Sequence, residues 1–189
     1  MTQLISLGGN CAVAFQLRKL DLYNNSFPFD WCKLNLKKLL KVLENNFENF
    51  ENIEFKKKSF NHKIIDKELT EIDSLIFRNN YGIEFAHEIC NKYEIDEFKK
   101  KIISRIEKFK NLENPIFIRL ETENLSDEKM KLYEKLEFLL KKYFDNFQII
   151  LISKHKYEST YIKWIELKEF SEDWKYPKIE WDKIWNKIL

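Results

Sequence analysis

Residues 4–31 read LISLGGNCAVAFQLRKLDLYNNSFPFDW, and they carry the main structural signals of the chain. The apolar run Leu4–Leu7 is typical of a buried strand, and the apolar positions of residues 13–20 recur at helical spacing. Gly8 and Gly9, two of only three glycines in the chain, lie between these segments. Because glycine permits positive φ angles and close backbone approach, we expect a sharp turn from strand to helix here.

Cys11 follows this turn and is the leading candidate for a chemical role. Asn10 is a favourable N-cap residue, so the sequence predicts that Cys11 lies in the first turn of the helix. The positive end of the helix dipole would lower the pKa of a thiol in that position. A thiolate attacks carbonyl carbon, so we expect Cys11 to be a nucleophile. The alternative is that Cys11 packs as a small buried hydrophobe.

Five blocks of the sequence resemble an uncharacterised family whose members are described as putative papain-like cysteine peptidases. The blocks are SLGGNC at 6–11, FPFDW at 27–31, YGIEFAH at 81–87, SRIEKF at 104–109 and IFIR at 116–119. The resemblance implies a cysteine peptidase with Cys11 as its nucleophile. It also implies that His87 occupies the histidine position of the family.

A thiol nucleophile needs a base, normally a histidine, which a carboxylate or an amide orients in turn. His87 is the first choice for this base, and a structural histidine is the alternative. His62 and His155 are rivals; His155 follows an expected strand at the carboxyl edge of a parallel sheet, where α/β proteins place ligands. Asp30, flanked by Phe and Trp, is the expected orienting group, unless it only holds its turn or caps the next helix.

Further residues are candidates for binding the substrate. Asn10 and Gly9, together with the backbone N–H of Cys11, lie in the turn where an oxyanion would need donors. Arg119 ends an expected strand and would hold a carboxylate or phosphate of the substrate. The alternative for Arg119 is a structural salt bridge, and Arg105, in a lysine-rich helix, is expected to be structural.

The charge balance and the cysteine content exclude several classes of protein. The 33 basic and 31 acidic side chains leave a net charge of +2, so no global field favours nucleic acid. No apolar segment is long enough to span a membrane, and the N-terminus lacks the basic region of a signal peptide. Three cysteines do not form a disulfide framework, which favours a reducing, cytoplasmic location. Cys32 and Cys90 are expected in the core or at the surface.

The chain as a whole predicts one α/β domain over residues 1–189. We expect amphipathic helices at 36–47, 95–109, 126–143 and from about 180, and strands at 116–120, 147–152 and 161–167. Strand, helix and strand with short connections imply a parallel sheet. The expected core therefore has three layers, similar to flavodoxin and to the flavodoxin-like lipases and esterases. A papain-like α+β fold is the alternative.

A change of hydrophobic period predicts an insertion in this core. Short runs at 53–55, 63–65, 75–78 and 83–87 are typical of strands, and residues 79–82 form a strong turn signal. The sequence therefore predicts a small antiparallel meander between the helix at 36–47 and the helix at 95–109.

These features together predict a cysteine hydrolase or acyltransferase that acts on an amide, isopeptide or thioester bond. Cys11 would attack, His87 would move the proton and Asp30 would orient His87. The chain has no phosphate-binding loop, dinucleotide fingerprint or paired metal ligands, so no cofactor or metal is expected. The alternative is a non-catalytic binding module in which Cys11 only packs beneath a ligand-accepting turn.

Overall fold

The structure is a computed structural model that describes residues 3–20, 25–32, 34–63, 69–85, 95–123, 126–169, 175–176 and 179–188. The side chains of residues 57–75 are not described. Two residues named in the sequence predictions, His87 and Cys90, lie outside the described residues.

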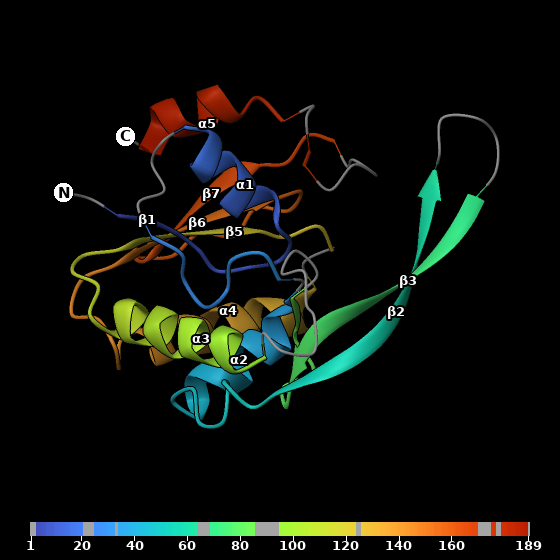
Figure 1. Ribbon diagram of the computed structural model, residues 1–189. Helices are drawn as coiled ribbons and strands as arrows, with labels where there is room; N and C mark the ends of the chain where they lie inside the picture. Colours follow the sequence, from blue (N-terminus) through green and yellow to red (C-terminus); the bar gives the residue numbers. More distant parts are fainter. Residues whose placement is uncertain are drawn as a thin grey trace.

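A four-stranded parallel sheet forms the centre of the protein (Figure 1). Its strands, in spatial order, are β1 (Leu4–Ser6), β5 (Ile116–Leu120), β6 (Gln148–Ser153) and β7 (Ile162–Glu166). All neighbouring pairs are parallel. The centre of β6 is a continuous apolar run and β5 is interrupted only by Arg119, as expected of strands whose two faces are both covered. The predicted parallel sheet is confirmed, with β7 as its expected edge strand.

Helices cover both faces of this sheet. On one face, Phe117, Ile149 and Leu151 pack with α2 (Leu36–Glu44), α3 (Ile95–Lys110) and α4 (Asp127–Leu140). On the other face, Ile118, Ile150 and Ile152 pack with α1 (Ala12–Lys19) and α5 (Trp181–Ile188). Successive side chains of a strand point to opposite faces, so one apolar strand serves both layers. Because α1 lies on the parallel sheet, the described residues do not place the Cys11 helix in a separate helical lobe, as a papain-like α+β fold would.

Side-chain caps fix where two of these helices begin. Asn35 Oδ1 accepts a hydrogen bond from Lys38 N at 2.9 Å at the start of α2. Ser126 Oγ accepts one from Lys129 N at 3.3 Å at the start of α4, which confirms the predicted cap. Such caps satisfy backbone N–H groups that have no partner within the helix.

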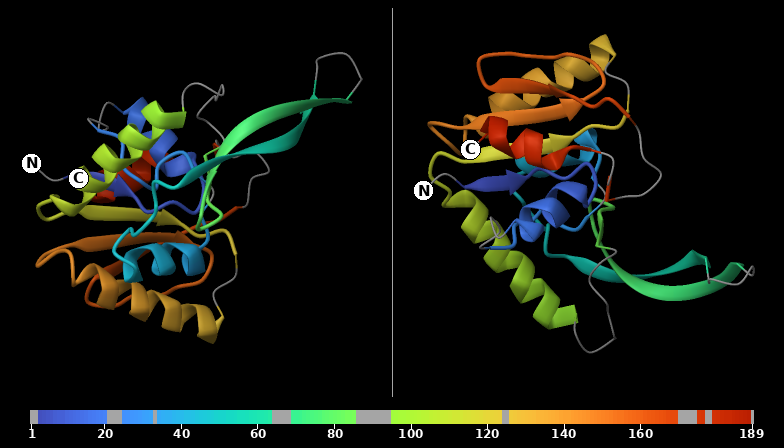
Figure 2. Two further views of the ribbon diagram at one scale, coloured as in Figure 1. Left: turned by 60° about the horizontal axis from the view of Figure 1, so that its bottom comes forward. Right: turned by 90° about the horizontal axis from the view of Figure 1, so that it is seen from above.

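The insertion is a three-stranded antiparallel sheet made of β2 (Ile53–Lys63), β3 (Leu69–Asn79) and β4 (Glu84–Phe85). The strands β2 and β3 form a long hairpin that projects away from the body of the protein (Figure 2). The antiparallel arrangement is therefore confirmed, but the four short strands predicted are three in the structure: the run at 53–55 and the start of the run at 63–65 both belong to the single long strand β2. Polar residues interrupt the apolar pattern without breaking the strands, because backbone hydrogen bonds hold a two-stranded ladder whatever the side chains are.

Candidate functional site

The turn from β1 to α1 is confined on two sides. Gly8 and Gly9 have φ angles of 74° and 91°, and a Cβ on Gly9 would lie 2.2 Å from the carbonyl oxygen of Leu120. The N–H of Gly9 donates to Leu34 O at 3.1 Å. The turn therefore fits between the end of β5 and residue 34 only because residue 9 has no side chain. The N–H of Gly9 therefore already has an acceptor within the protein. The predicted contribution of Gly9 to oxyanion binding stays a prediction.

Cys11 lies at the N-terminus of α1, one residue before the position predicted for it. The helix begins at Ala12, and Cys11 is its N-cap residue, with φ −76° and ψ −6°. Asn10 is not the N-cap; its Oδ1 accepts from Ala12 N at 2.8 Å. An asparagine side chain often bonds the backbone two residues ahead in this way. The oxyanion role of Asn10 stays a prediction.

The electrostatic surroundings of Cys11 are the opposite of those predicted. Its side chain is buried, at 9% exposure. This burial, with a smaller contribution from the negative charge of Asp30, raises the pKa of the thiol to about 12. Burial disfavours the charged thiolate, and a neighbouring anion disfavours it further. The predicted lowering of the pKa is therefore wrong for the described part of the chain.

Asp30 is completely buried and closes its own turn. Its Oδ2 accepts from Phe27 N at 2.6 Å, and its backbone N–H donates to Phe27 O at 3.2 Å. The turn-holding role that the sequence left open for Asp30 is present in the structure. Its role as the orienting group stays a prediction, since His87 lies outside the described residues.

The two rival histidines are in contrasting places. His62 pairs with Thr70 near the outer end of the β2–β3 hairpin, which projects away from the sheet (Figure 2). His155 is exposed and follows β6, and its backbone oxygen accepts from Ser153 Oγ at 2.8 Å. Of these two rivals, only His155 is therefore at the same carboxyl edge of the sheet as Cys11.

Cys32 belongs to the core, as one of the two alternatives predicted. It is fully buried and its thiol donates to Phe29 O at 3.2 Å. Burial raises the pKa of this thiol, with smaller contributions from Cys11 and Asp30, while Arg105 and Arg119 act in the opposite direction. The described cysteines are both free thiols.

Arg119 ties three segments together from a buried position, at 1% exposure. Its Nη1 donates to Leu7 O at 2.9 Å, and its Nη2 donates to Leu34 O at 3.3 Å. The same Nη2 lies 3.4 Å from Glu121 Oε2. The predicted alternative, a structural salt bridge, is thus present, and binding of a substrate anion by Arg119 stays a prediction.

Sequence reasoning missed the partners of this arginine. Glu121 also pairs with Lys129 at 3.1 Å and accepts from the Tyr133 hydroxyl at 3.3 Å. The sequence did hold one signal for the Arg119–Glu121 pair. The two residues are two positions apart on a buried strand and its extension, so their side chains lie on the same face. A buried charge needs such a partner.

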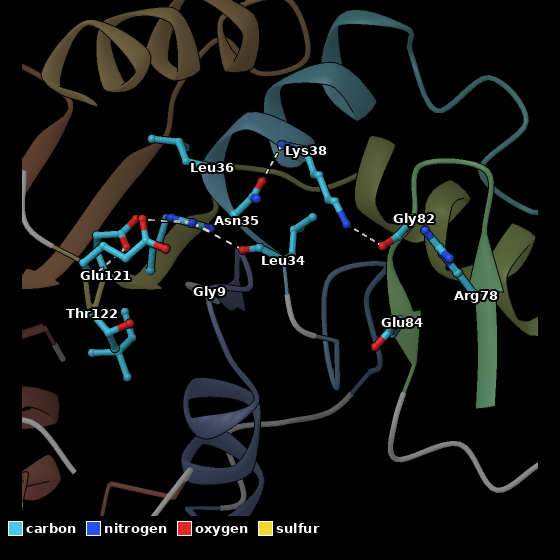
Figure 3. A pocket seen from close by; sticks show the side chains of 13 residues that line it. Gly9, Leu34, Asn35, Leu36, Lys38, Arg78, Gly82, Glu84, Glu121 and Thr122 are labelled. Atoms are coloured by element: carbon cyan, nitrogen blue, oxygen red, sulfur yellow. Dashed lines mark hydrogen bonds and ion pairs between the residues drawn. The ribbon is translucent and has the colours of Figure 1, made fainter. Parts of the chain in front are cut away.

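A pocket of about 350 Å³ opens beside the turn at Gly9 (Figure 3). It lies between the ends of β1 and β5, the first turn of α2 and the turn before β4. Its lining residues are Gly9, Leu34, Asn35, Leu36, Lys38, Arg78, Gly82, Glu84, Arg119, Leu120, Glu121, Thr122 and Glu123. Within the described part of the chain, Cys11 is not one of them. Lys38 and Arg78 were not predicted, because they come from separate elements that only the fold brings together.

The chain matches the model of a known protein family over the region that contains the sequence blocks quoted above. Residues 2–156 match the model of a family described as "Putative papain-like cysteine peptidase (DUF1796)". The chain belongs to this family. The matched region of the DUF1796 family contains the Cys11 turn, Asp30, His87, Arg119 and the whole pocket.

A relative from a giant virus is similar over most of the chain. An uncharacterized protein, R408, of Acanthamoeba polyphaga mimivirus is 27% identical over 187 residues, which covers 89% of this chain and 84% of the viral protein. The similarity to R408 therefore extends beyond the region that matches the DUF1796 family model.

The described residues of this DUF1796 protein contain no candidate for two other kinds of feature, a metal site and a membrane span. No group of three or more His, Cys, Asp or Glu side chains there has an arrangement that suits a metal ion. No helix among the same residues combines the length and the apolar character needed to cross a membrane.

Proposed function

We propose that this protein is a cysteine hydrolase or acyltransferase that acts on an amide, isopeptide or thioester bond through Cys11. One observation carries the proposal: Cys11 stands at the N-terminus of α1, directly after the first strand of a parallel sheet. Carbonyl substrates of α/β hydrolases are attacked from turns of this kind. The description of the family as cysteine peptidases supports the same chemistry.

The fold supports a comparison with lipases and esterases rather than with papain. We propose that the four parallel strands, with helices on both faces, form a core of the flavodoxin and lipase–esterase kind, with a cysteine in place of the serine. In that setting the nucleophile is neutral until a base removes its proton during attack. Papain-like enzymes instead hold the thiolate ready beforehand.

The raised pKa of Cys11 favours the first route. With a pKa of about 12, only about one thiol in 10⁵ is ionised at pH 7. We assign the base to His87 by its match to the family. As sulfur bonds to the carbonyl carbon, the thiol proton passes to the imidazole and the carbonyl electrons move to oxygen. The leaving group then takes that proton, and a water or a second acceptor cleaves the thioester that remains.

The turnover of p-nitrophenyl acetate tests this mechanism. Wild-type protein should release p-nitrophenol in a reaction that rises with pH through the pKa of an imidazole, at about 6.5. Cys11→Ser and His87→Ala should remove this activity, while Cys32→Ala, a matched change of a buried thiol, should retain it. Mass spectrometry should detect acetyl on Cys11. Turnover that survives His87→Ala would reject His87 as the base, and turnover that survives Cys11→Ser would reject the nucleophile.

A non-catalytic binding module is the second candidate, and two observations favour it. The thiol is held neutral, and the pocket beside Gly9 has walls that, in the described part of the chain, do not include Cys11. In this case Cys11→Ser would leave every measured property of the pocket unchanged, and wild-type protein would not accelerate the release of p-nitrophenol.

A further inference from the structure

Two cationic side chains from different elements meet at one end of the pocket beside Gly9 (Figure 3). Lys38 comes from the first turn of α2, and Arg78 comes from the end of β3. Both line the pocket and both are half-buried. Figure 3 shows Lys38 reaching toward Gly82, with Arg78 on the other side of this glycine.

The position of Gly82 shows how near these cations are to each other. Its φ angle is +68°, and a Cβ built on it would lie 3.2 Å from Lys38 Nζ and 3.2 Å from Arg78 Nη2. The Lys38 ammonium donates to Gly82 O. An ammonium has three N–H donors, so two remain for other acceptors, and the guanidinium of Arg78 has five.

No carboxylate in the described part of the chain forms an ion pair with Lys38 or Arg78. The acidic residues that line the pocket are engaged elsewhere: Glu84 with Lys56 at 2.9 Å, Glu121 with Arg119 and Lys129, and Glu123 with Lys129 at 2.8 Å. Glu84 lies opposite Arg78 in the β3–β4 pair, yet its carboxylate pairs with Lys56.

The start of α2 adds to the positive potential. Its first turn contains no acidic residue, although the helix dipole favours acidic side chains and disfavours lysine there. Two half-buried cations and a helix N-terminus therefore face one cavity, and among the described residues no carboxylate of its lining pairs with either cation. Unpaired like charges in a partly desolvated place are unfavourable unless an anion is bound.

We propose that Lys38 and Arg78 form a binding site for the anionic oxygens of a small ligand, either a carboxylate or a phosphate. Arg78 supplies the planar fork that binds two oxygens at once, and Lys38 supplies a point charge beside it. A cavity of about 350 Å³ suits a small organic ligand. This site gives a ligand class to the same pocket that the second candidate function invokes, and it does not require Cys11 to be a nucleophile.

Titration with inorganic phosphate and with malonate, as the phosphate and carboxylate probes, tests this site. Each anion is added to wild-type protein at a constant ionic strength of about 0.15 M, and the rise in melting temperature is measured. We expect a saturable rise with at least one anion, and the anion that saturates identifies the chemistry of the ligand. Arg78→Gln and Lys38→Gln should each weaken binding at least about tenfold, the usual effect of losing a charge-assisted hydrogen bond.

Lys37→Gln is the matched control, because Lys37 is in the same helical turn but exposed and outside the pocket lining. It should bind as the wild type does. Arg78→Lys keeps the charge and loses the fork, so it should bind with intermediate affinity. The proposal is overturned if neither anion gives a saturable rise, or if Lys37→Gln weakens binding as much as Lys38→Gln. Cys11→Ser should bind normally, which separates this result from any failure of the catalytic proposal.

Discussion

The Asp30 carboxylate and the Cys11 thiol are electrostatic neighbours: after burial, the charge of Asp30 is the second cause that raises the pKa of Cys11 to about 12. The same carboxylate holds its own turn through Phe27 N. A negative charge in this place keeps the thiol neutral. Any chemistry at Cys11 must therefore remove the proton during the attack, or bring a cation close to the sulfur.

Asp30→Asn separates the electrostatic effect of Asp30 on Cys11 from its hydrogen bond to Phe27 N. Asparagine keeps an oxygen that can accept from Phe27 N but removes the charge, so the pKa of Cys11 should fall. Since the thiolate is the reactive form, iodoacetamide should alkylate Cys11 about threefold to tenfold faster at a fixed pH below 9. Asp127→Asn, at the exposed start of α4, should leave the rate unchanged.

The rate of ester turnover in the same variant tests the orienting role of Asp30. If Asp30 holds His87 in its productive tautomer, Asp30→Asn should reduce ester turnover, by up to about four orders of magnitude as in a serine-protease triad. A slower alkylation in a variant that melts normally would contradict the electrostatic account.

Stability should fall as the solution becomes alkaline. Burial raises the pKa of Cys11 to about 12, and it also raises the pKa values of Cys32 and Tyr133. Above about pH 9 for the two thiols, and above about pH 10 for Tyr133, the unfolded chain loses these protons while the folded chain retains them, so the unfolded state binds fewer protons. Linkage then lowers the free energy of unfolding by about 1.4 kcal/mol per pH unit for each such group.

Urea denaturation at a series of pH values from neutral to alkaline measures this slope. Cys11→Ser removes one of the groups at nearly constant volume, so its slope between pH 9 and 12 should be shallower by the contribution of one proton. An identical slope in the wild type and in Cys11→Ser would mean that the native thiol ionises as an ordinary cysteine does.

The parts of the fold that depend on local pattern were predictable from sequence. Apolar runs indicated β5 and β6, helical spacing indicated α3, and Ser126 was identified as the cap of α4. These signals arise within one element or between close neighbours in the chain. The parallel order then followed from the short connections, because strands joined through a helix run in the same direction.

The candidate site was less predictable because its properties come from tertiary neighbours. The raised pKa of Cys11 depends on its burial and on Asp30, neither of which the motif encodes. The pocket depends on Lys38 and Arg78 meeting at Gly82. The one-residue shift at the start of α1 is different: Asn10 can either cap a helix or bond two residues ahead, and sequence does not choose between these.

Gly9→Ala should be far more damaging than a similar change at Gly82. A Cβ at residue 9 would lie 2.2 Å from the backbone oxygen of Leu120, so the end of β5 would have to move, whereas Gly82 meets only the ends of flexible side chains. Both residues have positive φ angles, so both substitutions carry a strain of about 1 kcal/mol. We expect Gly82→Ala to cost about that much. Gly9→Ala should cost at least about 3 kcal/mol or prevent folding.

Urea denaturation of the two variants checks this difference, with expression in soluble form as the second readout. A Gly9→Ala protein as stable as Gly82→Ala would show that the turn and β5 can separate without loss.

Arg119→Met should destabilise the protein by about 3–5 kcal/mol, the usual effect of removing one partner of a buried ion pair. The substitution leaves the oxygens of Leu7 and Leu34 without this donor and weakens the pairing of Glu121. Arg78→Met is the matched control: within the described residues this arginine has no ion pair, so its loss should change the free energy of unfolding by less than about 1 kcal/mol.

The double variant Arg119→Met/Glu121→Gln distinguishes the two parts of this effect. Removal of the Glu121 charge should recover part of the loss, because the double variant no longer buries a carboxylate that has lost its arginine. The backbone oxygens of Leu7 and Leu34 stay without this donor, so the recovery should be incomplete. Chemical denaturation of the wild type, Arg119→Met, Glu121→Gln and the double variant measures the coupling between the two residues. If Arg119→Met is within about 1 kcal/mol of the wild type, the guanidinium does not hold these segments together. Arg119 would then be available to bind the substrate anion that the sequence assigned to it.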